Sequence, residues 1–591
     1  MRGRKNSVTI CADFETTTTA EDCRVWACGL YYMGTKEFEC GNSIEYFFDK
    51  MAEIGDCTVY FHNLKFDGTF ILDWLFRHGY EHSTERKLFK GQFSTLISDK
   101  NLFYSIKIKM KSKATITILD SLKIIPFSVK VIAKSFGLSI QKGEIDYSYP
   151  RPVGWEITPE EYSYIKNDCE IVGQALQQLF DQDLTKMTQG SNALADFKTT
   201  LPRKFERIFP PPEYDADIRQ AYKGGFTYVN PKFQGMNIGK GVVYDKNSMY
   251  PSMMKYKPLP YDEGVHFDGA YIEDEFYPLY IQAFSCVFEV KKNYLPTIQI
   301  KTGYMGFVPT EYVTSSNGEE ITLCLTSVDF ELFLEHYDII GGINFLGGWK
   351  FRAATGLFDG YIDKWYKVKE ESTRNGNKGM RTLAKLMLNA LYGKFALNPH
   401  VQSKIPYYDE EEKLVKYKLG EEEERDPLYL PVACFITAYS REDVIRNAQA
   451  NYDRFIYADT DSLHLVGTEP PENMDIDDYR LGAWKQESTF IKARFLRAKC
   501  YIEFIPGALP RKVYPVRKEN VHVGHYGKKR LHYASIKVTC AGMPSSCHDF
   551  VTWENFAIGN SFPGKKRFQT VSGGAILTET PFKIKENLLS V

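Results

Sequence analysis

The sequence predicts an α+β protein of several domains, and three observations support this. The chain has 591 residues, enough for more than one hydrophobic core. Strand-like and helix-like patterns mix throughout, without an internal repeat or a low-complexity segment. Proline-containing stretches mark soft boundaries at 150–159, 209–214 and 257–264. The pattern favours separate mixed domains over one continuous barrel.

Composition narrows the class of protein. Hydrophobic residues make up 43% and aromatic residues 15% of the chain, as in a folded soluble protein. There is no apolar run of the roughly 18 residues that a membrane-spanning helix needs. The apolar run after the basic start is too short for a signal peptide. The 12 cysteines are scattered without a C-x-x-C pair, which indicates reduced thiols and no zinc site. We therefore expect a cytoplasmic protein that binds no membrane.

Charge is distributed unevenly although the net charge is −1. Residues 485–567 contain 16 Lys and Arg against 5 Asp and Glu, whereas acidic residues gather at 407–413 and 420–425. A segregated basic stretch suits a phosphate backbone. An ordinary solvated surface would have the same composition, so charge alone leaves both interpretations open.

The N-terminal region contains carboxylates in a strand pattern. Residues 7–17, SVTICADFETT, are predicted to form a strand, and Asp13 and Glu15 are two apart and share one face of it. The segment 60–72 adds Asp67. A DxE strand alone is usually only a strand edge, so this motif needs partners.

A helix is predicted for residues 158–180. Thr158 is a suitable N-cap, a proline follows it, and Glu161 completes a capping box. Tyr164 and Asp168 are four residues apart and therefore share one face. Four carboxylates from three segments could then hold two metal ions about 3.5–4 Å apart, which would activate a water and stabilise the leaving oxygen of a phosphodiester.

A second carboxylate group is predicted farther along the chain. In YADTDSLHL (457–465), Asp459 and Asp461 stand at the turn of a predicted hairpin between β-forming residues. Like charges this close raise each other's pKa and need compensation by water, a cation or a metal ion. Asp245, at the end of a predicted strand in 242–254, is a candidate partner for a shared metal.

Residues 382–396 are predicted to be helical. Arg381 and Lys385 share one face, and Asn389 and Tyr392 continue it. Two cations followed by an aromatic ring suit a nucleoside triphosphate, although a solvated basic stripe has the same pattern.

These motifs together resemble a known family. DFET, HNLKFDG and YIKND resemble the three exonuclease motifs of proofreading DNA polymerases. DKNSMYP, KLMLNALYG, YADTDS and KCY resemble, in order, the motifs of family B DNA polymerases, most closely the protein-primed members of bacteriophage phi29 type. The likeness runs from about residue 10 to the C-terminus and includes YKGGFT, PTIQIK, ATGLF and CAGM; the segment 507–530 departs from it.

The resemblance implies a domain plan. We expect an RNase H-like 3′-5′ exonuclease domain at 1–188 and a right-hand polymerase with palm, fingers and thumb after it. The implied parts are palm at 189–256 and 429–533, fingers at 355–396, thumb at 534–591, an insertion at 257–354 that binds the terminal protein and DNA, and an insertion at 397–428 that forms a hairpin for strand displacement and processivity.

The resemblance also implies catalytic residues and a cofactor. Polymerase catalysis is expected at Asp245, Asp461 and Asp459, with Asp245 and Asp461 as metal ligands and Asp459 in a tuning role. Exonuclease catalysis is expected at Asp13, Glu15, Asp67, Tyr164, Asp168 and Lys142, with the four carboxylates as metal ligands. Mg²⁺ is the expected cofactor, with two ions per site and Mn²⁺ as a substitute.

Substrate contacts follow from motif position. Tyr250, Arg381, Lys385, Asn389 and Tyr392 are expected to bind the nucleotide, with Tyr250 under the sugar. Lys499 and Tyr501 are expected to hold the primer, and Tyr222, Gly224 and Gly225 to lie in a loop between the two activities. His62, Asn63, Phe66, Ser121 and Leu122 are expected to grip single-stranded DNA, where an aromatic ring can stack on a base.

The implied function is replication of a linear phage genome by a protein-primed DNA polymerase with proofreading and strand displacement. The expected partners are primer–template DNA, deoxynucleoside triphosphates and a terminal protein, and we expect a monomer in the host cytoplasm. Two alternatives are a nuclease or transposase that uses only the first carboxylate cluster, and a nucleic-acid-binding scaffold with decayed sites. The KLMLNALYG helix argues against the first and the intact carboxylates against the second.

Overall fold

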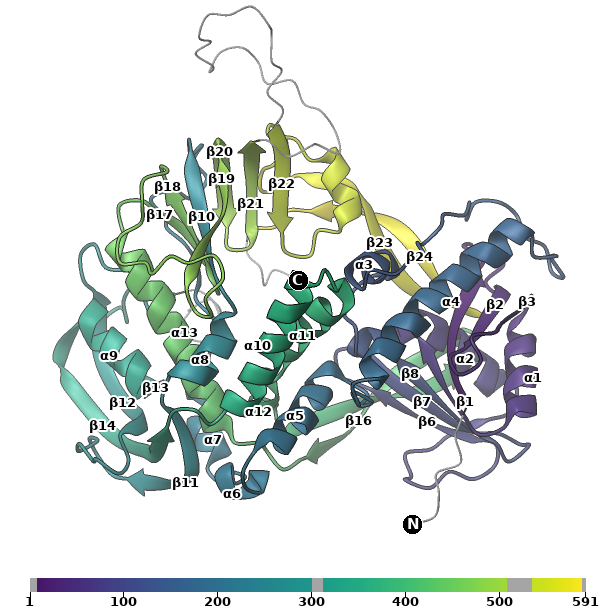
Figure 1. Ribbon diagram of the computed structural model, residues 1–591, viewed down its shortest axis with the longest axis horizontal. Coiled ribbons are helices and arrows are strands. Elements are labelled where there is room, and N and C mark those ends of the chain that lie inside the picture. Colours follow the sequence, from purple (N-terminus) through teal and green to yellow (C-terminus); the bar gives the residue numbers. More distant parts are fainter. Residues whose placement is uncertain (1–7, 300–311, 507–533, 587–591) are drawn as a thin grey trace, which may run out of the picture.

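The computed structural model describes residues 8–299, 312–506 and 534–586 (Figure 1). The segment 507–530, which departs from the family pattern, and the end of PTIQIK lie outside the described residues. No described helix is long and apolar enough to cross a membrane.

The N-terminal domain is built on an eight-stranded sheet in the order β3-β2-β1-β4-β8-β7-β6-β5 (Figure 1). β1 runs antiparallel to β2 and parallel to β4, which is parallel to β8. The strands are β1 Val8–Thr16, β2 Val25–Tyr32, β3 Phe38–Gly41, β4 Cys57–Phe61, β5 Glu81–His82, β6 Gln92–Ile97, β7 Phe103–Lys109 and β8 Thr115–Asp120; the helices are α1 Ile44–Ile54, α2 Leu64–Arg77, α3 Val129–Ser135 and α4 Pro159–Phe180. Parallel pairing at β1, β4 and β8 brings the carboxyl ends of these strands to one edge.

Helix α4 begins as the sequence predicts. The Glu161 backbone N–H donates to the Thr158 hydroxyl at 3.2 Å, and the Thr158 N–H donates to the Glu161 carboxylate at 3.0 Å. Pro159 occupies the first helical position, where no N–H is needed. The predicted capping box is confirmed, and it fixes where Tyr164 and Asp168 emerge two turns later.

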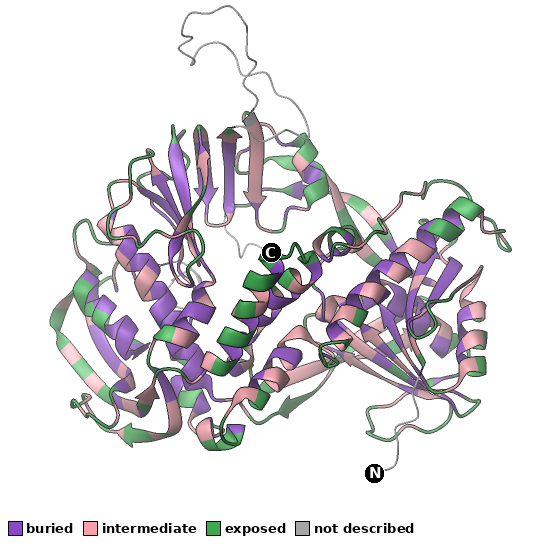
Figure 2. Cartoon of the chain, viewed as in Figure 1, coloured by how far each residue is buried: buried purple, intermediate pink, exposed green. Residues whose placement is uncertain are grey.

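The central sheet has five antiparallel strands in the order β19-β10-β18-β17-β9. Its strands are β9 Thr227–Val229, β10 Gly241–Lys246, β17 Phe455–Asp459, β18 Ser462–Val466 and β19 Trp484–Phe490, with helices α8 Met249–Tyr256 and α13 Leu430–Ala450 beside it. Helix α13 is buried on most of its sides (Figure 2), as its apolar sequence requires. It contacts α8, α9 and β11 and so ties the sheet to the first insertion.

Two antiparallel helices face this sheet, α10 Asp359–Arg374 and α11 Lys378–Ala390 (Figure 1). Leu383, Ala384, Met387 and Leu388 bury one side of α11. The predicted helix at 382–396 begins earlier, at Lys378, and is interrupted after Ala390, with α12 Tyr392–Phe395 as a separate short helix. The other short connecting helices are α5 Gln189–Thr200, α6 Phe205–Ile208 and α7 Asp215–Ile218.

Both predicted insertions form compact units. Residues 259–354 contain the sheet β11-β14-β12-β13 and helix α9. Their bounds are β11 Leu259–Phe267, β12 Leu279–Val290, β13 Ile321–Thr326, α9 Ser327–His336 and β14 Tyr337–Ala354. The predicted hairpin is present as β15 His400–Asp409 and β16 Leu414–Glu424. It docks on the N-terminal domain, where Asp99 N donates to Gln402 O at 3.0 Å and Lys404 Nζ to Asn101 at 2.8 Å.

The C-terminal part closes back on the N-terminal domain. β20 Lys492–Arg497, β21 Cys500–Pro506 and β22 Ala534–Cys540 form one sheet, and β23 Ser561–Val571 pairs with β24 Gly574–Lys583. At Gly574 a Cβ would lie 2.3 Å from the Phe70 ring, so only glycine allows β24 to approach α2 this closely. The expected boundary before residue 534 falls inside a sheet, and the domain limits stay predictions.

Candidate active sites

The first carboxylate cluster comes from three elements of the N-terminal domain. Asp13 and Glu15 lie on β1, Asp67 lies in the first turn of α2, and Asp168 lies on α4. Glu15, Asp67 and Asp168 are 5%, 3% and 4% exposed. Asp67 accepts a hydrogen bond from the Phe14 N–H at 3.2 Å, which fixes α2 against β1.

Burial and mutual repulsion raise the pKa values in this cluster. Burial, with the Asp168 charge second, raises the pKa of Asp13 to about 7. Burial and then Asp13 raise the pKa of Glu15 and of Asp67 well above the usual range. Lys142 forms an ion pair with Asp168 and opposes this rise, although burial still raises the pKa of Asp168. The cluster therefore holds more negative charge than its own cation neutralises.

The side chains of Tyr164 and Lys142 also lie at this cluster, beside Asp168. The Tyr164 hydroxyl lies 2.8 Å from that of Tyr147, and the Lys142 ammonium lies 5.0 Å from the centre of the Tyr164 ring. All six predicted exonuclease residues are thus brought together. Tyr147 was missed, because no spacing rule connects it to α4.

The predicted single-strand contacts surround the start of α2. A His62 ring nitrogen lies 2.9 Å from the Ser121 hydroxyl, and Asn63 adopts a left-handed φ of 75°. Ser121 is fully buried and its hydroxyl donates to Phe61 O. Its side chain therefore positions the His62 ring and is not open to solvent. The Leu122 N–H donates to Asp120. The Phe66 ring lies 6.4 Å from that of Phe568 on β23, so the C-terminal hairpin borders this region.

The second carboxylate group lies on the central sheet. Asp245 is the second-to-last residue of β10 and lies opposite Ser462. The Lys246 N–H donates to the Asp461 carbonyl at 2.8 Å in the β17–β18 turn. Burial, with the Asp245 charge second, raises the pKa of Asp461 to about 6. Sheet register, and not sequence proximity, brings these two carboxylates together.

Asp459 lies in a different environment from Asp461. Its carboxylate accepts from the Lys499 ammonium at 2.5 Å and from the Thr227 hydroxyl at 3.2 Å. The tuning role expected for Asp459 stays a prediction, since Asp245 is paired with a lysine as well. Lys499 has a left-handed φ of 55°, and its N–H donates to the Tyr457 hydroxyl. Tyr501 is 7% exposed and stacks on Phe495 with ring centres 4.8 Å apart.

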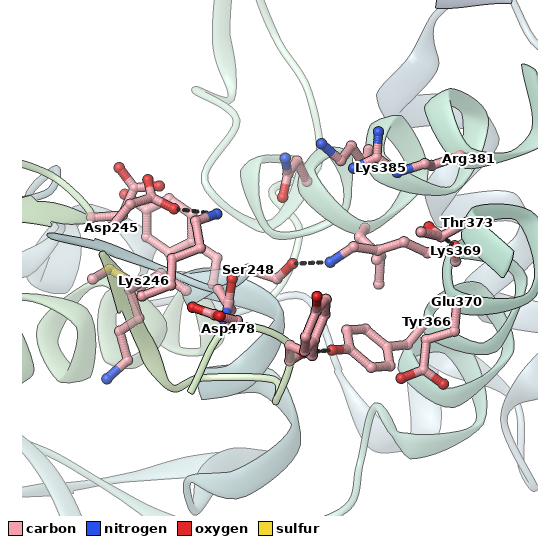
Figure 3. Close-up of a pocket in the computed structure, with 18 of the residues that line it drawn as sticks. Asp245, Lys246, Ser248, Tyr366, Lys369, Glu370, Thr373, Arg381, Lys385 and Asp478 are labelled. Carbon is pink, nitrogen blue, oxygen red and sulfur yellow. Dashed lines mark hydrogen bonds and ion pairs between the residues drawn. The ribbon is translucent and has the colours of Figure 1, made fainter. Parts of the chain in front are cut away.

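A cavity of about 740 Å³ opens between the carboxylates of Asp245 and Asp461 and the helices α10 and α11 (Figure 3). Arg381, Lys385 and Asn389 are exposed on one face of α11, as predicted, and line it. Tyr250 and Tyr392 line it as well, with ring centres 4.0 Å apart. The structure thus gathers every predicted nucleotide-binding residue around one cavity.

Lys369 and Lys485 are two of the cavity-lining cations that were missed from the sequence. Lys369 on α10 donates to the Ser248 hydroxyl at 3.2 Å, and Lys485 on β19 forms an ion pair with Asp245 at 2.9 Å. Burial, then the charges of Lys385 and Lys485, lower the pKa of Lys369 to about 8. Helical spacing could not find Lys369 because its partners lie on another helix, and Lys485 is brought in by strand pairing.

The loop from Tyr222 to Gly225 meets the β17–β18 turn. At Gly225 a Cβ would lie 2.7 Å from the Thr460 side chain and 3.0 Å from its Cα, so glycine permits the close approach. The buried Arg441 guanidinium donates to Lys223 O and Gly224 O at 2.8 Å each. At Gly224 there is open space, so its backbone is accessible.

The chemistry of both carboxylate groups fits Mg²⁺, which prefers hard oxygen ligands and keeps waters or substrate phosphates in its shell. Across the described ranges, no three His, Cys, Asp or Glu side chains are already arranged as a complete metal site. Two carboxylates completed by substrate oxygens suffice for such an ion. After burial, a neighbouring carboxylate is the next cause of the raised pKa of Asp13 and of Asp461, and a divalent cation would relieve this repulsion.

Comparison with known proteins gives a consistent result. The family model described as DNA polymerase type B, organellar and viral, matches residues 53–153 and 148–478. The DNA polymerase of Bacillus phage M2 is 46% identical over 97% of this chain and 99% of its own length. The DNA polymerases of Bacillus phage phi29 and Streptococcus phage Cp-1 are 45% and 34% identical, each over 97% of this chain and 98% of their own length.

Solved structures match over the same extent. Phi29 DNA polymerase complexed with primer–template DNA aligns with a TM-score of 0.89 and 43% identity, covering 98% of this chain and 100% of that chain. Its complex with primer–template DNA and incoming nucleotide substrates aligns with a TM-score of 0.89 and 44% identity, with the same coverage.

Proposed function

The chain belongs to the type B DNA polymerases of organelles and viruses, and from this premise we propose that it replicates a linear phage genome from a protein primer, proofreads, and displaces the downstream strand. The predicted fold class and family are confirmed by the relatives and by the solved structures. The chain is therefore a DNA-directed DNA polymerase. Protein priming, the exonuclease and strand displacement belong to the proposal.

One observation carries the proposal of two activities: two separate carboxylate groups lie in one chain, each beside different substrate-binding residues. Asp245 and Asp461 face a cavity lined by cations and aromatic rings. Asp13 and its partners lie instead on the N-terminal sheet, beside His62 and Asn63. A nuclease or transposase would have no use for the cavity beside Asp245 and Asp461.

The residues of the polymerase site divide the work of nucleotidyl transfer. Arg381, Lys385 and Lys369 face the cavity from the helices and bind the triphosphate. Tyr250 packs against Tyr392 and lies under the sugar. Asp245 and Asp461 would hold Mg²⁺, which when bound lowers the pKa of the primer 3′-hydroxyl and neutralises charge on the phosphates.

The exonuclease residues have the matching roles. Asp13, Glu15, Asp67 and Asp168 would hold Mg²⁺ there as well. Tyr164, whose hydroxyl is fixed by Tyr147, orients the attacking water, and the Lys142 ammonium stabilises charge beside Asp168. His62, Asn63 and Phe66 hold the frayed primer end, and Phe66 stacks on an unpaired base.

The partners follow from the same proposal. Solved complexes of phi29 DNA polymerase contain primer–template DNA, incoming nucleotides and single-stranded DNA, and we assign the same ligands to this chain. The sheet and helix at 259–354 bind the terminal protein and DNA, and the β15–β16 hairpin encloses the DNA. The chain acts as a monomer in the host cytoplasm.

The test separates the two activities by mutation. Asp461→Asn removes a proposed metal ligand and lowers extension of a primed template by about a thousandfold, several kcal/mol of transition-state stabilisation. Degradation of single-stranded DNA persists in this variant. Asp13→Ala combined with Glu15→Ala has the reverse effect. Loss of both activities in either folded variant contradicts the two-site assignment.

Priming is tested separately. Labelled deoxynucleotide is incubated with the chain, Mg²⁺ and candidate terminal proteins, and a covalent label on one candidate supports protein priming. A chain that extends DNA primers but labels no terminal protein of its own phage does not use a protein primer.

A further inference from the structure

Lys485 stands directly opposite Asp245 in the central sheet. The antiparallel register of β10 and β19 pairs the two residues, and the Lys485 ammonium lies 2.9 Å from Asp245 Oδ1. The side chains are 36% and 26% exposed, so the pair is open to a ligand in the cavity. No spacing in the sequence joins residues 240 positions apart.

Two lysines near this carboxylate are already paired with other carboxylates. Lys246, next to Asp245, turns away to Asp443 with an ammonium–carboxylate distance of 2.6 Å (Figure 3). Lys499 is engaged by Asp459 at 2.5 Å. Asp245 and Asp461 repel each other, and Lys485 contacts Asp245 directly, while the charge of Lys385 acts on Asp245 from the opposite wall.

Lys485 also lines the nucleotide cavity, opposite the cations of α10 and α11. Asp245 lies on one side and Lys369, Arg381 and Lys385 on the other (Figure 3). Lys485 contributes to lowering the pKa of both Lys369 and Lys385, which shows that its charge acts across the cavity. A triphosphate between the two walls lies within its influence.

A lysine is suited to exchange partners. Its ammonium is a compact charge on a flexible four-carbon stem with three donors, and it can bind either a carboxylate or a phosphate oxygen. Mg²⁺ on Asp245 and the ammonium of Lys485 compete for the same negative charge. A ligand that brings both a metal ion and phosphates would displace the lysine from Asp245, because the metal ion takes its place there. The same ligand would offer the lysine a phosphate oxygen as a new partner.

We propose that Lys485 is a placeholder cation of the polymerase site: it neutralises Asp245 while the site is empty and moves to the triphosphate when nucleotide and metal arrive. The inference rests on the proposed nucleotidyl-transfer role of Asp245 and Asp461. Lys485 is a positioning residue for the carboxylate in the empty state and a triphosphate ligand in the loaded state.

Two quantities follow in opposite directions. Removing the ammonium removes a competitor, so the empty carboxylates bind a divalent cation more tightly. It also removes a phosphate ligand, so the nucleotide binds more weakly. A purely structural ion pair would instead weaken the fold and leave both affinities in place.

The experiment uses the full chain with Asp13→Ala and Glu15→Ala, which silences the other carboxylate cluster. Lys485→Met keeps the stem and removes the charge. Mn²⁺ alone is titrated without DNA or nucleotide, and free Mn²⁺ is followed by electron paramagnetic resonance. We expect the dissociation constant to fall about threefold or more because the competing cation is gone.

Steady-state extension with saturating Mg²⁺ gives the second readout. Lys485→Met raises KM for the deoxynucleotide about fivefold or more, with kcat within about twofold, as expected for a binding contact. Lys485→Arg brings KM most of the way back to the value of the chain with an intact Lys485. The matched control is Lys198→Met on α5, which breaks an ion pair with Glu206 at 3.1 Å, removes a lysine of similar exposure (39%) and leaves both readouts unchanged.

An unchanged Mn²⁺ dissociation constant or an unchanged KM in Lys485→Met overturns the inference. Failure of the proposed polymerase function would show differently, as no extension by the chain with an intact Lys485. The Mn²⁺ titration needs no catalysis, so the two failures are distinguished.

Discussion

The buried ion pair between Arg441 and Asp329 gives the sharpest stability prediction. Arg441 on α13 donates to Asp329 on α9 through Nε at 3.0 Å and Nη2 at 2.6 Å, and the side chains are 2% and 8% exposed. Its remaining Nη1 donates to Lys223 O and Gly224 O. One side chain therefore joins three parts of the chain: the central helix, the first insertion and the loop beside the polymerase carboxylates.

Arg441→Met leaves the Asp329 carboxylate buried without the Arg441 cation and removes the hydrogen bonds that Arg441 donates to Lys223 O and Gly224 O. Breaking a buried pair from one side costs about 3–5 kcal/mol. At about 1.4 kcal/mol per tenfold, local opening of α9 and α13 rises by a hundredfold or more. Extension activity falls as well, because the loop from Tyr222 to Gly225 is no longer held by Arg441 beside the polymerase carboxylates.

The same helix supplies the matched control. Arg446 bonds Glu335 of α9 at 2.8 Å and Glu442 at 3.1 Å, but its side chain is 38% exposed. Arg446→Met breaks the same kind of contact at the surface and costs about 0–1 kcal/mol.

Native-state amide hydrogen exchange of α9 and α13 measures both variants, since unfolding of a multidomain chain is not two-state. Replacing both partners, as Arg441→Met with Asp329→Leu, recovers much of the stability because no charge is left buried. If exchange in Arg441→Met matches that in Arg446→Met, the pair is not a stabilising anchor and the reasoning is refuted.

Four further outcomes are expected. Tyr250→Val, which removes the ring under the sugar, improves ribonucleotide incorporation while deoxynucleotides are still used, and unchanged discrimination in a competition assay assigns the gate elsewhere. Deleting about residues 400–420 of the β15–β16 hairpin leaves gap filling on single strand intact but abolishes synthesis through downstream duplex, where each pair opened costs about 1.4 kcal/mol. As pH falls, the Mg²⁺ concentration for half-maximal activity rises, near pH 7 for the exonuclease and near pH 6 for the polymerase, because Asp13 and Asp461 have pKa values of about 7 and about 6 and must be ionised to bind a cation. Raised pKa values also mean that the metal-free fold gains stability from these groups as pH falls through those values. Native-state amide exchange of β1 and β17 at pH 5.5 and 8 with a chelator present, corrected for the intrinsic pH dependence of exchange, checks that sign.

The local parts of both sites follow from the sequence. Asp13 and Glu15 share a strand face because side chains alternate at every second residue, and Arg381, Lys385 and Asn389 share a helix face because they are four apart. The capping box of α4 likewise depends on two residues only three positions apart, Thr158 and Glu161. Covalent geometry sets these periods, so no tertiary contact is needed to predict them.

Tertiary structure decided which of these faces meet and which charges are compensated. Lys485 reaches Asp245 only through the register of β10 and β19, and Lys499 neutralises Asp459 only because β21 begins beside the β17–β18 turn. The placement of Arg441 depends on packing three segments at once. The sequence by itself determined the family, the local elements and the carboxylates that each presents. Pairings across hundreds of residues depend on the packing of whole sheets and helices against one another, and no local period encodes that packing.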